Sequence, residues 1–176
     1  MATLVLGPPP PELQELLDRR RRFGADRHDE VWAGVYHMVP GPSYTHSSFL
    51  IQLAEILAPI GRAAGLKMTA EFNLGESKQD FRIPDAGLHR PGAGGIWLST
   101  AALVIEILSP EDEAWEKLPF YAAHDVDEVA VIDPRARSVD WLGLSGDQYK
   151  PLERSALVEL GPAELAARID WPPDNH

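Results

Sequence analysis

The sequence predicts an α+β fold in which helices flank a mixed β-sheet, and three patterns carry this prediction. Residues 43–64 repeat apolar side chains every three or four positions, which is typical of an amphipathic helix. Residues 103–108 and 128–133 are short, apolar and rich in β-branched side chains, as expected of buried strands. A helical pattern at 112–124 lies between them, so the two strands are expected to be parallel within a right-handed βαβ unit.

The N-terminal residues are expected to lie outside the main domain. Residues 1–24 are assigned to a proline-rich extended arm followed by a short helix, which begins at Pro11 because proline suits the first helical turn. Residues 25–176 form the main domain. It opens with a predicted β-hairpin over residues 30–38, with Gly34 in its turn.

The segment after the hairpin alternates between expected helix, strand and loop. Pro59 should bend or end the last turn of the long helix. Residues 66–74 and 81–83 predict strands, and Asp85 is expected to end the second of them. Residues 88–95 contain glycine, proline and histidine, so they are expected to form a loop.

The C-terminal half continues with a helix, a hairpin and a final strand and helix. Pro119 must either kink the helix at 112–124 or mark its restart. Residues 138–142 are expected to pair antiparallel with the strand at 128–133. A last strand is expected around 156–160, and a short helix from Pro162.

Composition limits the classes of function. The chain has 176 residues, no cysteine and a net charge of −11, and no apolar run long enough to cross a bilayer, so a cytoplasmic protein without disulfides is expected. The acidic balance argues against tight non-specific binding to nucleic acid. The exception is Arg19-Arg20-Arg21-Arg22, which is interpreted either as cations at a helix C-terminus or as a phosphate-contacting patch.

The acidic residue within the most apolar predicted strand is the strongest functional signal. Glu106 shares one strand face with Val104, and a buried carboxylate is costly unless it is paired or binds a metal. Asp85 and Lys117 would provide a second carboxylate and a cation, although Asp85 alone also suits a turn. A buried ion pair between Glu106 and Arg82 is the structural alternative.

Two carboxylates and a lysine at the end of a strand suit metal-dependent cleavage of a phosphodiester. Asp85 and Glu106 would hold Mg²⁺ or Mn²⁺ through oxygen ligands. Lys117 and Tyr121 lie four residues apart on one helix face, where the lysine would add positive charge beside the scissile phosphate.

Over residues 25 to 160, the order and spacing of six short segments resemble one protein family. These segments are Asp29–Met38, Pro42–His46, Ile83-Pro84-Asp85, Val104–Pro110, Glu116–Tyr121 and Val131–Pro134. The chain resembles the Uma-two family of restriction-endonuclease-like proteins, within the PD-(D/E)XK nuclease superfamily. The resemblance implies Asp85 and Glu106 as metal ligands and Lys117 as the catalytic lysine. It departs from the superfamily pattern at Leu108, where that lysine commonly stands.

The resemblance also implies accessory residues and a function. Glu55 and Glu30 are both candidates for the acid that many such nucleases carry on their first helix, while His46 and Tyr121 are further accessory candidates. The implied function is a metal-dependent endonuclease acting on DNA. The alternatives are a catalytically silent module that binds nucleic acid or protein on the same fold, and a small-molecule enzyme.

Self-association is expected from the aromatic content of the chain. One small domain does not readily bury the aromatic surface of four tryptophans, Trp32, Trp97, Trp115 and Trp141. This content predicts a symmetric homodimer.

Overall fold

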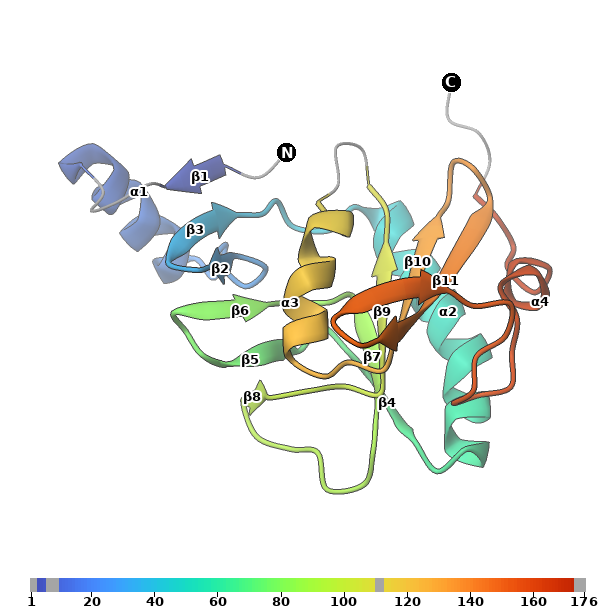
Figure 1. The fold of residues 1–176 in the computed structure, drawn as a ribbon. Helices are drawn as coiled ribbons and strands as arrows, with labels where there is room; N and C mark the ends of the chain where they lie inside the picture. Colours follow the sequence, from blue (N-terminus) through green and yellow to red (C-terminus); the bar gives the residue numbers. More distant parts are fainter. Residues whose placement is uncertain (1–2, 6–9, 110–112, 173–176) are drawn as a thin grey trace.

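The computed structural model describes residues 3–5, 10–109 and 113–172, and these residues form two six-stranded sheets (Figure 1). The first sheet has the strand order β1-β3-β2-β6-β5-β8, and the second has the order β12-β11-β10-β9-β7-β4. The prediction of an α+β fold with a mixed sheet flanked by helices is confirmed, although the strands divide between two sheets.

The first sheet is built from short strands that include the predicted hairpin. Its strands are β1 (Thr3–Val5), β2 (Glu30–Trp32), β3 (Val35–Met38), β5 (Asn73–Ser77), β6 (Asp80–Arg82) and β8 (Trp97–Leu98). The hairpin β2–β3 pairs antiparallel, and Val31 lies opposite Phe81 of β6.

The second sheet holds the central strands of the molecule. Its strands are β4 (Lys67–Ala70), β7 (Ala86–His89), β9 (Leu103–Ile107), β10 (Glu128–Asp133), β11 (Ser138–Ser145) and β12 (Gln148–Pro151). Strands β9 and β10 are parallel, whereas β7 is antiparallel to β9 and β11 to β10. The predicted βαβ unit and its C-terminal hairpin are therefore confirmed.

The described helices are α1 (Pro11–Arg22), α2 (Tyr44–Ala63), the 3₁₀ turn η1 (Trp115–Lys117), α3 (Leu118–Ala123) and α4 (Pro162–Ala166). Ser43 caps α2 by accepting a hydrogen bond from the backbone N–H of His46. None of the helices in the described part of the chain is both long enough and apolar enough to span a bilayer.

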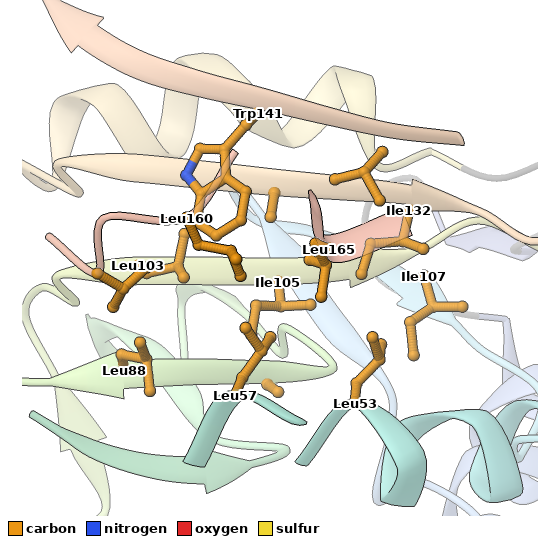
Figure 2. Packing of buried hydrophobic residues seen from close by; sticks show 14 of the residues in the cluster. Leu53, Leu57, Leu88, Leu103, Ile105, Ile107, Ile132, Trp141, Leu160 and Leu165 are labelled. Carbon is orange, nitrogen blue, oxygen red and sulfur yellow. The ribbon is translucent and has the colours of Figure 1, made fainter. Parts of the chain in front are cut away.

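Helices cover both faces of the second sheet. On one face, α2 and α4 pack on the odd-numbered residues of β9, and Figure 2 shows Leu53, Leu57, Leu103, Ile105 and Trp141 in this cluster. On the other face, Phe120 and Tyr121 of α3 pack against Val104 and Val129. Because strand residues alternate between faces, Glu106 lies on the α3 face.

Several boundaries differ from those predicted. The segment predicted as a single strand at 66–74 forms β4 and the start of β5, which belong to different sheets. Helix α2 continues through Pro59 to Ala63, so its final turn does not end there. Asp85 precedes β7 and does not end the preceding strand, and β7 extends to His89, so the loop begins only at Arg90.

The C-terminal region also departs from the prediction. No strand forms at residues 156–160; instead the last strand of the sheet is β12, at residues 148–151. Pro119 does mark a restart, because the 3₁₀ turn η1 ends and α3 begins with Pro119 in its first turn. The first residue of the predicted helix, Asp112, lies outside the described residues.

Candidate active site

Asp85, which directly precedes β7, lies beside Glu106 of the neighbouring strand β9. Ala86 pairs with Ile105 in the antiparallel register of β7 and β9, which places Asp85, one residue earlier, opposite Glu106, one residue later. The backbone N–H of Ile107 donates to Oδ2 of Asp85 at 2.7 Å, which fixes this carboxylate beside β9.

Lys117 and Tyr121 reach Glu106 from the helical segment that follows β9. The Lys117 ammonium lies 3.2 Å from Oε1 of Glu106, and the Tyr121 hydroxyl donates to the same oxygen. The expectation that these two residues share one face is confirmed. The Arg82–Glu106 pair considered as an alternative does not form, because Arg82 donates to Asp80 and to the carbonyl of Val31.

Glu30 enters the same cluster from the first sheet. Its Oε1 lies 3.1 Å from the Lys117 ammonium and accepts a 2.7 Å hydrogen bond from the backbone N–H of Ile83. Its Oε2 accepts a 2.6 Å hydrogen bond from the Trp32 indole. The side chain of Glu30 is only 4% exposed, so the carboxylate is held between the hairpin and η1.

His46 and Glu55, both on α2, have different positions. Nε2 of His46 lies 3.0 Å from Oδ1 of Asp85, so the N-terminus of α2 reaches the site. Glu55 is exposed on α2, and no hydrogen bond or ion pair joins it to the cluster within the described part of the chain. Of the two candidates left open, Glu30 contacts the cluster through Lys117, although it lies on strand β2 and not on a helix.

Burial and neighbouring charges perturb the titration of the cluster. The pKa of Glu106 is raised from its ordinary 4.5 to about 8, and burial is the largest cause. Lys117 opposes the rise, Asp85 and Glu30 add to it, and the hydrogen bond from Tyr121 opposes it. Burial alone would lower the pKa of Lys117, but Glu106, Glu30 and Asp85 together raise it above its ordinary value. Lys117 is therefore a firmly protonated cation.

The donor set suits a hard cation held by two carboxylates. Among the described residues, no three His, Asp or Glu side chains form a group able to hold a metal ion. Magnesium, however, is commonly bound through one or two carboxylates and retains several waters. The facing pair Asp85 and Glu106 meets this smaller requirement.

The comparisons with known proteins agree with the fold and with the predicted family. The family model Uma2, described as "Putative restriction endonuclease", matches residues 11–171. The chain belongs to this family, and family membership supports a nuclease-like function. The match also includes α1, which the sequence analysis assigned to an N-terminal arm.

One similar solved structure supports the fold. A protein from Anabaena variabilis ATCC 29413, described as "a putative nuclease belonging to DUF820", is 16% identical, with a TM-score of 0.63. The match covers 80% of this chain and 90% of that one. A chain of the DrdV–DNA complex is 14% identical with a TM-score of 0.43, over 89% of this chain and 12% of that one. No curated protein matches the chain.

Proposed function

We propose that this protein is a metal-dependent endonuclease that hydrolyses phosphodiester bonds of DNA. Asp85 and Glu106 would hold Mg²⁺ or Mn²⁺, and Lys117 would be the catalytic lysine. The observation that carries the proposal is the convergence of these residues from the segment just before β7, from β9 and from η1. Lys117 lies 3.2 Å from Glu106, and Asp85 lies beside Glu106.

Each residue of the site would have a distinct chemical role. The bound cation would supply Lewis acidity and lower the pKa of a coordinated water. Lys117 stays protonated beside the carboxylates, so it acts as a positive charge on the phosphate and not as a base that takes a proton. The Tyr121 hydroxyl orients Glu106, and Ile107 and His46 orient Asp85.

The substrate assignment rests on the family description and on the site, since the global charge of −11 does not favour broad phosphate binding. Part of the arginine run in α1 is engaged within the fold. Arg20 pairs with Asp29 at 2.7 Å, and Arg21 pairs with Asp18 at 3.2 Å. We therefore propose that DNA is recognised locally around the carboxylate site.

Cleavage of supercoiled plasmid in Mn²⁺ or Mg²⁺ tests this function. We expect wild-type protein to nick the plasmid and Glu106→Gln to lose at least about 100-fold of the rate, because the substitution removes a ligand charge but keeps the shape. Glu76→Gln is the matched control, since Glu76 is exposed on β5. If the wild type neither cleaves nor binds Mn²⁺ in calorimetry, a catalytically silent module on the same fold is the better account.

A further inference from the structure

The contacts of the Glu30 carboxylate are those expected of a residue that positions a neighbouring side chain. Three donors converge on its carboxylate: the Lys117 ammonium and the Ile83 backbone N–H on Oε1, and the Trp32 indole on Oε2. Both oxygens are thus engaged in a side chain that is 4% exposed. An ionised carboxylate has about four lone-pair sites, so these three donors leave Glu30 little capacity for a cation.

Glu106 differs from Glu30 in this respect. The contacts described for Glu106, from Lys117 and Tyr121, both fall on Oε1, which leaves Oε2 without a donor among the described residues. The two glutamates therefore share Lys117 but differ in their capacity to bind a cation. Glu106 retains an oxygen with no described donor, whereas both oxygens of Glu30 already accept one.

The hairpin that carries Glu30 is tied to the helix that follows Lys117. The Arg82 guanidinium lies 4.4 Å from the Trp32 ring centroid and 4.0 Å from that of Phe120 in α3. Trp32 also stacks on His37 of β3, with ring centroids 4.1 Å apart. This stack links β2, which carries Glu30, to α3, which begins directly after Lys117.

We propose that Glu30 is a positioning residue that holds the Lys117 ammonium beside Glu106, and that it is not a metal ligand. The proposal gives the β2–β3 hairpin of the first sheet a role in the site. The kinetic consequence of this positioning role rests on the proposed function. Without Glu30, the flexible four-carbon side chain of Lys117 would keep only its contact with Glu106. The ammonium would then sample positions away from the reacting phosphate.

The first arm of the test needs no catalytic activity. We would record the lysine side-chain ammonium signals of ¹⁵N-labelled protein, in which a buried, doubly paired Lys117 exchanges slowly enough to be seen. Lys117→Met assigns the signal. We expect Glu30→Gln to abolish it and Trp32→Phe to weaken it, while Glu76→Gln leaves it unchanged. Trp32→Phe keeps the ring stack and tests the proposal should Glu30→Gln fail to fold.

The second arm separates positioning from metal binding. By calorimetry, Glu30→Gln should weaken Mn²⁺ binding by no more than about 10-fold, the low end of the effect of groups that only support metal ligands, whereas Glu106→Gln should weaken it by more than about 100-fold. In cleavage assays, Glu30→Gln should lower kcat by about 10-fold or more with little change in KM. The double variant Glu30→Gln/Lys117→Met should be no slower than Lys117→Met alone, because both changes remove one interaction.

The outcomes distinguish the positioning role from the proposed function. An unchanged Lys117 ammonium signal in both Glu30→Gln and Trp32→Phe would overturn the positioning role. A loss of Mn²⁺ affinity in Glu30→Gln equal to that in Glu106→Gln would make Glu30 a metal ligand and also overturn it. If wild-type protein neither binds Mn²⁺ nor cleaves DNA, the nuclease proposal fails, and the ammonium signal still decides whether Glu30 holds Lys117.

Discussion

Replacing Glu106 with glutamine should change how stability depends on pH. The pKa of this buried carboxyl rises from 4.5 to about 8 in the folded protein. Each pH unit between these values is worth about 1.4 kcal/mol, so the window from 4.5 to about 8 corresponds to an upper bound of about 5 kcal/mol. Lys117 is charged in both folded and unfolded states throughout this window and does not change the slope.

The direction follows from where the proton is bound. Between pH 4.5 and about 8 the folded state keeps the Glu106 proton while the unfolded chain loses it. The stabilisation that Glu106 provides as a neutral acid is therefore complete below pH 4.5 and is lost as the pH rises to about 8. Glutamine stays neutral at every pH, so the variant lacks this loss and gains stability relative to wild type as the pH rises.

Urea unfolding of the metal-free proteins at pH 5, 6, 7 and 8 measures the difference directly. We expect the free energy of unfolding of Glu106→Gln minus that of wild type to increase by several kcal/mol across the series. The control Glu76→Gln should show no such trend. A difference that stays constant, or that decreases with pH, would mean that Glu106 is held ionised by Lys117, and would refute the reasoning.

Three further predictions concern packing and assembly. Glu128→Ala should lower the free energy of unfolding in urea by about 3 kcal/mol. The substitution leaves the Trp141 indole, the Ser155 hydroxyl and the Ala156 N–H without their acceptor. An unchanged free energy of unfolding would contradict this prediction. Gly87→Ala should cost about 1–3 kcal/mol, measured in the same way, since the added Cβ would lie 2.7 Å from the Phe72 ring and 3.0 Å from the Leu103 carbonyl oxygen. The homodimer stays a prediction. Trp141 is buried, but Trp115 is 43% exposed. Sedimentation at micromolar concentration that shows only a monomer would oppose the predicted homodimer.

The parts of the fold with strong local patterns could be predicted from the sequence. The apolar periodicity of α2 and the two β-branched strands β9 and β10 define the helix and the parallel pair without any long-range information. The same pattern exposed Glu106 as an anomaly, since a carboxylate in such a strand demands a partner. Lys117 and Tyr121 followed from helical spacing.

The remaining parts depend on pairing between distant segments. Strand β7 begins Ala86-Gly87, which has little β propensity, and it forms because it pairs with both β4 and β9. The position of Glu30 in the site depends on the Trp32–Arg82–Phe120 stack, whose members lie far apart in the sequence. Neither the pairing of β7 nor this stack leaves a pattern in the local sequence, so the choice between Glu30 and Glu55 had to remain open.

A crystal of the full chain soaked in MnCl₂ tests the central claim most directly. We predict an anomalous difference peak between β7 and β9, within about 2.0–2.6 Å of one carboxylate oxygen each from Asp85 and Glu106. The peak should be lost in Glu106→Gln crystals and retained in Glu30→Gln crystals. Absence of a peak at this pair at saturating Mn²⁺, or a peak only at Glu113 beside His37, would contradict the account.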